Sequence, residues 1–202
     1  MPSADPGGAG EQSDDLPRFR AVGEQTVHQG WFISVSRATF VGPDGVAFSR
    51  DVVRHPGAVA VVAVTDGGSV VLVRQFRPAI NQWVLEIPAG TRDVEDEPVE
   101  DTARRELAEE AGYAAVRLDR LVRCVITPGF CDEFATIYLA TGLTRVPSER
   151  QGVEERFMSI VEVPLDRFDG MVDDGEIIDA STILGVGLAR RRLQGGPATD
   201  AP

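Results

Sequence analysis

The stretch GTRDVEDEPVEDTARRELAEEAGY, residues 90–113, carries the strongest structural signal in the chain. Between Asp93 and Glu110 it holds nine acidic side chains and two arginines, which gives a local charge of −7. Pro98 suits the first position of a helix and Gly112 suits its end, so the pattern predicts a helix over 98–111.

Three glutamates of this helix, Glu106, Glu109 and Glu110, would lie on one face, within about 100° of one another. An apolar row with i, i+4 spacing occupies the neighbouring face and is expected to pack on a sheet. The glutamates repel each other, and we expect them to have no local basic partner on the helix. A divalent cation would supply the missing charge, and carboxylate oxygens suit Mg²⁺ or Mn²⁺. The alternative is an ordinary solvated acidic face.

Apolar runs on both sides of the helix indicate strands. The expected strands cover residues 31–41, 46–54, 57–65, 69–76, 82–87, 116–127, 134–141 and 155–163, and two further helices cover 165–172 and 180–193. Strands and helices do not alternate regularly, so we expect an α+β fold with a mixed sheet. The first two strands form an antiparallel N-terminal hairpin.

Composition divides the chain into four regions. Residues 1–17 and 195–202 are rich in Gly, Pro and acidic or small side chains and are expected to be disordered tails. Residues 18–56 form a β arm, and residues 57–194 form the main domain.

Charge and composition exclude several classes of protein. The 202 residues include 32 acidic and 20 basic side chains, a net charge of −12, which argues against nucleic acid as a partner. No apolar run approaches the roughly 18 residues of a membrane span, and the acidic N-terminus does not resemble a secretory signal. Two cysteines cannot build a disulfide scaffold, and no P-loop or serine elbow is present. We expect a cytoplasmic protein that acts on small molecules.

The acidic helix and the residues before it resemble the Nudix box, G-x5-E-x7-R-E-U-x-E-E-x-G-U, where U is apolar. From Glu97 onwards the match is complete as far as the final position, where Tyr113 replaces the commoner aliphatic residue. Gly90 and Glu97 are separated by six residues rather than five. An insertion in a loop costs little, but it leaves Asp96 at the unshifted position and so leaves open which acid fills the first-glutamate role.

The resemblance implies a Nudix fold, an α/β/α sandwich, and a hydrolase that requires Mg²⁺, with Mn²⁺ as a possible substitute. The implied metal ligands are the main-chain carbonyl of Ala89 and the carboxylates of Glu106, Glu109 and Glu110. Arg105 would orient the glutamates. This chemistry is reasonable because metal ions must neutralise a diphosphate before water can attack phosphorus.

Outside the box, residues 127–130, with Pro128, resemble the ADP-ribose pyrophosphatase branch of the family, as do residues 74–77 and 86–90. The substrate-binding residues that this resemblance implies are Arg54, Arg77, Glu86 and Phe130. Arginine suits bidentate phosphate contact. In this branch the arginine that matches Arg54 is often supplied across a homodimer. The resemblance therefore implies that the arm, residues 18–56, mediates dimerisation.

The general base in this branch is a glutamate on a loop beyond the box. Glu155 is the first candidate here and Glu154 the second. The implied reaction is Mg²⁺-dependent hydrolysis of ADP-ribose to AMP and ribose 5-phosphate by a homodimer. Two alternatives stay open: another nucleoside diphosphate sugar such as GDP-mannose, or a Nudix domain that binds a nucleotide without cleaving it.

Overall fold

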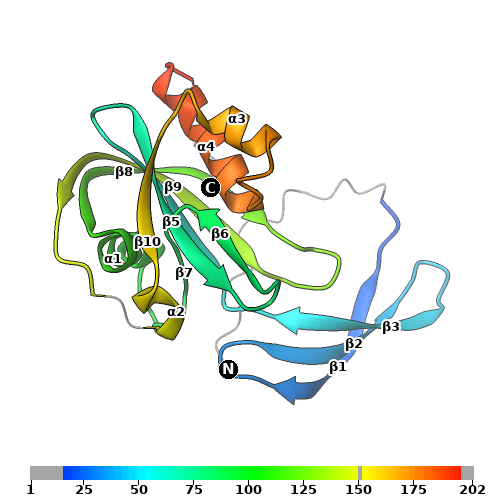
Figure 1. Ribbon diagram of the computed structural model, residues 1–202. Coiled ribbons are helices and arrows are strands. Elements are labelled where there is room, and N and C mark those ends of the chain that lie inside the picture. Colours follow the sequence, from blue (N-terminus) through cyan, green and yellow to red (C-terminus); the bar gives the residue numbers. More distant parts are fainter. Residues whose placement is uncertain (1–15, 150–151, 197–202) are drawn as a thin grey trace. The chain divides into compact units, whose positions relative to one another are not determined.

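The computed structural model describes residues 16–149 and 152–196, so most of both predicted tails lies outside the described residues. The chain divides into two compact units (Figure 1). Of the described residues, one unit contains 16–57 together with Thr127–Glu133, and the other contains Ala58–Ile126, 134–149 and 152–196. In the described part of the chain, no helix combines the length and apolar character needed to cross a membrane.

The N-terminal unit is an antiparallel sheet of three strands in the order β1-β2-β3, with bounds β1 Arg20–Gln29, β2 Ser34–Val41 and β3 Ala47–Arg54. β2 and β3 are the predicted hairpin, closed by a turn in which Gly45 has a φ of 80°. The prediction missed β1. Every residue of β1 is exposed, so the strand lacks the buried apolar alternation that would indicate it.

The second unit is built on a larger mixed sheet. Its strands are β4 Ala58–Val64, β5 Ser69–Arg77, β6 Gln82–Glu86, β7 Ala89–Thr91, β8 Tyr113–Val125, β9 Phe134–Arg145 and β10 Ser159–Pro164. The order is β10-β5-β4-β9-β8, with β6 paired to β5 and β7 to β4. β4 and β9 pair in parallel, whereas the other strand pairs described in this unit are antiparallel. The sheet is therefore mixed, as predicted.

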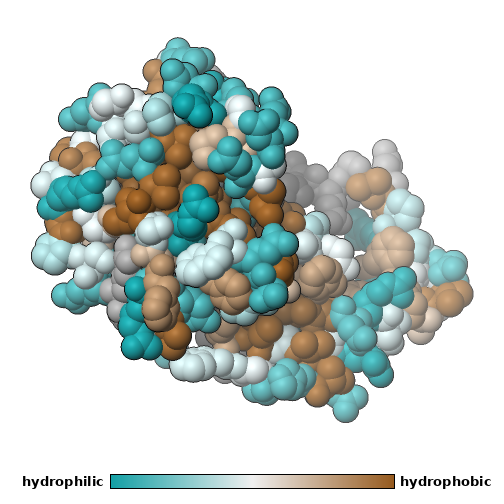
Figure 2. Space-filling view, in the orientation of Figure 1, coloured by the Kyte–Doolittle hydropathy of each residue, from teal (hydrophilic) through white to brown (hydrophobic). Residues whose placement is uncertain are grey.

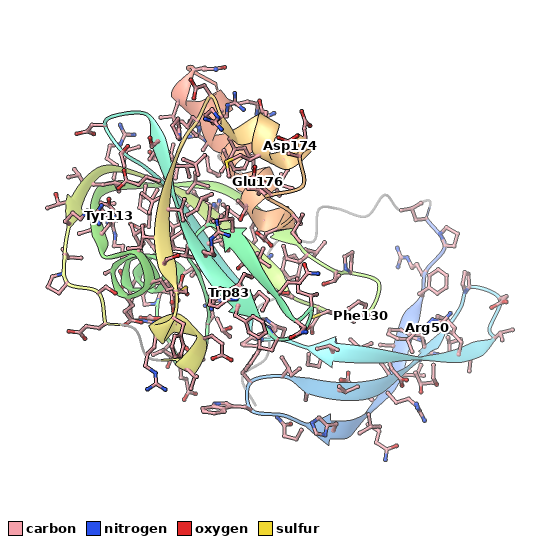
Figure 3. All side chains as sticks on the ribbon, viewed as in Figure 1. Arg50, Trp83, Tyr113, Phe130, Asp174 and Glu176 are labelled. Carbon is pink, nitrogen blue, oxygen red and sulfur yellow. The ribbon has the colours of Figure 1, made fainter. Side chains whose placement is uncertain are left out.

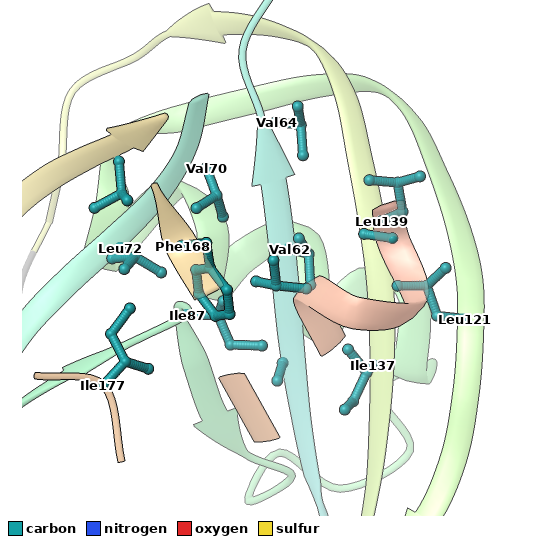
Figure 4. Packing of buried hydrophobic residues seen from close by; sticks show 14 of the residues in the cluster. Val62, Val64, Val70, Leu72, Ile87, Leu121, Ile137, Leu139, Phe168 and Ile177 are labelled. Carbon is teal, nitrogen blue, oxygen red and sulfur yellow. The ribbon is translucent and has the colours of Figure 1, made fainter. Parts of the chain in front are cut away.

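Helices cover the two faces of this sheet. Helix α1 (Val99–Ala111) packs on one face, and α4 (Ala180–Leu193) packs on the other face together with the short helix α3 (Phe168–Asp173). Alternate residues of β4 supply the two cores. Val59 and Val61 pack with Leu107 of α1, whereas Val62 packs with Val186 of α4 (Figure 4). Side chains alternate along a strand, so a strand buried on both faces is apolar throughout. Each fully buried valine contributes about 1.5–3 kcal/mol.

Several elements differ from the prediction by a few residues, and three of the differences lie near the acidic helix or follow from it. Residues 155–158 are not strand: Val153–Arg156 form the short helix α2, and β10 begins at Ser159. β7 was not predicted, because three residues are too short for a periodicity to show. β8 begins at Tyr113, directly after α1, because the long hairpin with β9 pairs it with Arg145.

Candidate active site

Helix α1 brings its glutamates against the sheet instead of into solvent. Gly112 ends the helix with a φ of 67°, a left-handed conformation that glycine adopts without strain. Glu106 and Glu110 are only 9% and 4% exposed, whereas Glu109 is partly exposed. Burial of two carboxylates on one helix is costly unless a proton, a basic group or a cation compensates them.

The carboxylate of Glu106 packs against the main chain of strand β7. A Cβ atom at Gly90 would lie 2.0 Å from the carboxyl carbon of Glu106 and 2.3 Å from its Oε1 atom. Any side chain at Gly90 would therefore displace the carboxylate. Gly90 pairs with Val59 of β4, so the glutamate lies directly beside the main chain of the sheet.

Glu110 contacts Ala89, the residue before Gly90 in β7. The Ala89 amide donates a hydrogen bond of 2.9 Å to its Oε2 atom. Burial raises the pKa of Glu110 to about 8, even though this hydrogen bond opposes the shift. Burial likewise raises the pKa of Glu106 to about 7. In both cases a nearby Glu155 adds negative charge. The site therefore attracts positive charge.

Arg105 links the acidic residues of α1 to the loop before it. It forms a two-point contact with Glu97, in which Nε and Nη2 each lie 3.1 Å from a carboxylate oxygen. Its Nη1 also donates to Glu106 at 2.7 Å and to Glu109 at 3.2 Å. The hydrogen bond from Arg105 lowers the pKa of Glu97. Arg105 thus contacts three glutamates. The expectation that the helix glutamates have no local basic partner was therefore wrong for Glu106 and Glu109, because Arg105 lies directly before one and four residues before the other.

Arg77 and Glu86 form a second charged pair on neighbouring strands, β5 and β6. The Arg77 Nε lies 2.9 Å from both oxygens of the buried Glu86, and Nη2 contacts Oε2 as well. Burial lowers the pKa of Arg77, but Glu86 outweighs this effect, and the charges of Glu110 and Asp179 raise the pKa further. Arg77 is therefore close to the glutamate cluster, and Glu86 holds it in place.

The two candidates for the general base lie on α2. The negative charge of Glu155 acts on both Glu106 and Glu110, which places Glu155 near the cluster. Glu154 is not among the main causes of the pKa shifts of Glu106 and Glu110. The structure brings Glu155, Arg77 and the α1 glutamates together in one unit.

The remaining two predicted residues, Arg54 and Phe130, belong to the N-terminal unit. Arg54 makes a two-point contact with Glu24 of β1, at 2.9 and 2.6 Å, and a 3.0 Å contact with Asp132. Phe130 accepts a 2.7 Å hydrogen bond from the amide of Val53 through its main chain, and its side chain is 57% exposed (Figure 3). The loop that contains Phe130 is thus attached to β3.

Comparison with known proteins identifies the family. Residues 54–181 match the model of the NUDIX domain. The chain belongs to the Nudix hydrolase family. It is 36% identical over 167 residues to an ADP-ribose pyrophosphatase of Bacillus subtilis (strain 168), covering 83% of this chain and 90% of the relative. It is 38% identical over 184 residues to an ADP-ribose pyrophosphatase of Mycobacterium tuberculosis (strain ATCC 25618 / H37Rv), covering 91% and 88%.

A solved structure shares the Nudix fold. The crystal structure of an ADP compounds hydrolase superposes with a TM-score of 0.79 at 24% identity, over 91% of this chain and 98% of that one. The predicted fold class, with a mixed sheet between helices and an antiparallel N-terminal β arm, is therefore confirmed.

The extra residue in the Nudix box has a structural explanation. Glu97, not Asp96, makes the two-point contact with Arg105. Asp96 is exposed and has a φ of 60°, so the loop accommodates one more residue there. Asp tolerates the left-handed region better than most side chains. The spacing changes while the glutamate–arginine contact is kept.

The donor set of the Nudix site suits a hard divalent cation. Within the described residues, no three His, Cys, Asp or Glu side chains already meet as a metal cluster. Arg105 and the Ala89 amide instead occupy oxygens of the glutamates. The donors are all oxygen, two of them are buried, and Gly90 leaves room for the Glu106 carboxylate. These features fit Mg²⁺ or Mn²⁺.

The sequence analysis missed two charged residues of the N-terminal unit. Glu24 and Asp132 hold Arg54, and Asp132 also accepts a 2.8 Å hydrogen bond from the His55 amide. Glu24 lies on the strand that was not predicted, so no pattern pointed to it. Asp132 follows the Pro-Gly loop closely, and that position is the one signal that could have drawn attention to it.

Proposed function

We propose that this Nudix hydrolase cleaves the diphosphate bond of ADP-ribose, in a Mg²⁺-dependent reaction, to give AMP and ribose 5-phosphate. The observation that carries the proposal is the buried pair Glu106 and Glu110, packed against β7 with Arg77 nearby. The identity to ADP-ribose pyrophosphatases over most of the chain supports the choice of substrate.

The metal would be held by Glu106, Glu109 and Glu110 together with the main-chain carbonyl of Ala89. Bound there, Mg²⁺ would neutralise the diphosphate and polarise its phosphorus–oxygen bonds. Arg105 keeps these carboxylates in place through its contacts with Glu106 and Glu109. Mn²⁺ prefers the same oxygen donors and is expected to substitute.

Arg77 and Arg54 would bind the charged part of the substrate. Arg77 has the better support, since it lies close to the glutamate cluster and is fixed by Glu86. Glu86, which holds Arg77, is proposed together with it as part of the substrate-binding site. Arg54 and the exposed Phe130 side chain are proposed as substrate contacts on the strength of the ADP-ribose pyrophosphatase resemblance.

Glu155 would take the proton from the attacking water. Its charge acts on both buried glutamates, so a water near the metal ligands would be near this carboxylate too. Glu154, one residue earlier on α2, is the second candidate.

The arm is proposed to form a homodimer interface. It exposes several large apolar side chains, among them Phe19, Val27, Trp31 and Phe32, and Trp31 is fully exposed. Brown apolar surface is visible among hydrophilic residues on this unit in Figure 2. A monomer gains nothing from such exposure, whereas a partner would bury it. Cys124 and Cys131 are thiols rather than a disulfide, which agrees with the proposed cytoplasmic location.

The test is a coupled phosphate-release assay over a panel of nucleoside diphosphate compounds, with and without Mg²⁺. We expect strong, Mg²⁺-dependent turnover of ADP-ribose. Preference for GDP-mannose or another nucleoside diphosphate sugar would keep the chemistry and overturn the choice of substrate. Tight binding of one compound with no turnover would indicate a nucleotide-binding domain instead.

A further inference from the structure

The segment between β6 and β7 connects the two halves of the proposed site. Glu86, at the end of β6, holds Arg77, and the amide of Ala89, at the start of β7, donates a hydrogen bond to Glu110. Between them, the Pro88 carbonyl accepts a 2.8 Å hydrogen bond from the Val61 amide of β4. A shift of this segment would therefore move a substrate arginine and a metal ligand together.

Helix α4 contacts the same segment from the opposite face of the sheet. The Ile87 amide donates a 2.9 Å hydrogen bond to the Thr182 hydroxyl. Both residues are buried, with Thr182 0% and Ile87 1% exposed, and Ile87 lies in the core beneath α4 (Figure 4). A buried amide needs a partner, and here the partner is one side-chain oxygen.

Asp179 sets the orientation of that hydroxyl. Its Oδ2 atom accepts hydrogen bonds of 2.7 Å from both the amide and the hydroxyl of Thr182. An ionised carboxylate only accepts hydrogen bonds, so the Thr182 hydroxyl must donate to Asp179. The hydroxyl's lone pair is then directed to Ile87. Asp179 is also the N-cap of α4, and its charge acts on Arg77.

We propose that Thr182, oriented by Asp179, is a positioning residue for the hydrolysis reaction. It fixes Ile87 from the α4 side while Glu110 fixes Ala89 from the α1 side. The Glu86–Gly90 segment is thereby held in the position that both Arg77 and the metal ligands require. This inference rests on the proposed function. Thr182 lies one residue beyond the part of the chain that matches the NUDIX model.

The decisive comparison is Thr182→Val against Thr182→Ser in the full chain. Valine keeps the shape but removes the acceptor, whereas serine keeps the acceptor. We expect Thr182→Val to lower kcat and weaken Mg²⁺ affinity about 10- to 100-fold, the usual effect of losing a residue that supports metal ligands. Thr182→Ser should retain kcat within about twofold. Hydrogen exchange at the Ile87 amide should quicken only in the valine variant.

Val186→Ala is the matched control, because Val186 is buried on the same helix and offers no polar atom to the segment. It should lower Tm without changing kcat. If Thr182→Val does not fold, Asp179→Ala tests the link from its other end and should lower kcat in the same direction. Unchanged kcat and Mg²⁺ affinity in the folded Thr182 or Asp179 variant would overturn the proposal. A wild-type protein with neither turnover nor Mg²⁺ binding would instead overturn the proposed function, and this inference with it.

Discussion

Each unit contains an arginine that contacts several carboxylates, and the pKa values of these carboxylates shift in opposite directions in the two units. In the N-terminal unit, Arg54 contacts the carboxylates of Glu24 and Asp132, and its hydrogen bond to Glu24 lowers the pKa of that group. On α1, Arg105 serves Glu97, Glu106 and Glu109, yet burial still raises the pKa of Glu106 to about 7.

The difference separates structural charge from charge available for chemistry. The Arg54 cluster already stabilises the ionised form of its carboxylate. In the α1 cluster, burial outweighs the arginine, so the ionised forms of Glu106 and Glu110 are disfavoured without a cation. Carboxyl groups with such strongly perturbed pKa values cluster at functional sites. The following substitutions and the pH experiment test this difference between the α1 cluster and the Arg54 cluster.

The largest effect should come from Glu106→Gln. The change removes a proposed metal ligand while keeping the size of the side chain, so we expect kcat to fall by about 1,000-fold, or about 4 kcal/mol of transition-state stabilisation. Steady-state turnover of ADP-ribose measures this. Glu100→Gln is the control, since Glu100 lies on the same helix, is exposed and pairs with Arg104. Near-normal turnover in Glu106→Gln would remove the metal-ligand assignment.

Gly90→Ala should have the next largest effect. The new methyl group would occupy the place of the Glu106 carboxylate, so we expect about a 100-fold loss of kcat and about 1–3 kcal/mol loss of stability. Turnover and chemical denaturation report the two effects separately. At Gly67 a Cβ would meet its nearest atom at 3.8 Å, so Gly67→Ala should change neither quantity. Full activity in Gly90→Ala would show that the carboxylate can sit elsewhere.

Arg54→Ala should have a smaller and different effect. If Arg54 binds substrate phosphate or ribose, KM for ADP-ribose should rise about tenfold while kcat changes little, because the lost contact stabilises the ground and transition states alike. Arg37→Ala is the matched control, because Arg37 forms an exposed pair with Asp51 on the same sheet. An unchanged KM accompanied by a lower Tm would make Arg54 purely structural.

The smallest effect should be the pH dependence of stability in the metal-free protein. The folded-state pKa values of Glu106 and Glu110, about 7 and 8, lie above the ordinary 4.5, so the folded protein binds these protons more tightly. Their stabilisation is complete below pH 4.5 and is lost as the pH rises through 7 and 8. Glu24 has the opposite sign, and its stabilisation is lost as the pH falls below 4.5.

Thermal unfolding between pH 5 and 9, with a chelator present, measures this dependence. Tm should fall across the range, and Mg²⁺ at pH 8 should restore it. The double variant Glu106→Gln, Glu110→Gln should show a flatter profile. A wild-type Tm that stays constant from pH 5 to 9 would contradict the raised pKa values.

Sequence was most informative where local chemistry and tertiary structure agree. The apolar run of β4 and the acidic helix α1 could be predicted because burial on two faces and helical spacing leave direct traces in the residue order. The sequence predicted the contact between Glu97 and Arg105 only in part. The Nudix box pattern left two acids, Asp96 and Glu97, as candidates for the first-glutamate role, and the conformation of Asp96 was needed to choose between them.

Contacts between distant residues were not predictable. Nothing in the local sequence of Thr182 indicates that its hydroxyl accepts from Ile87, 95 residues away. The same holds for Glu24 and Arg54, because the exposed strand β1 lacks apolar alternation. Glu155 and Arg156, the second half of α2, were assigned to a strand because a single helical turn is too short to show a period.

The parallel pairing of β4 with β9 also has a consequence for how the chain folds. Ala58 is opposite Ala135, 77 residues later, so the centre of the sheet cannot close until most of the protein has been synthesised. Contacts of such high sequence separation slow folding. Until β9 arrives, the stretch AVAVVAV of β4 has unpaired main-chain groups and an apolar surface on both faces. During synthesis, this strand is therefore the segment most exposed to aggregation.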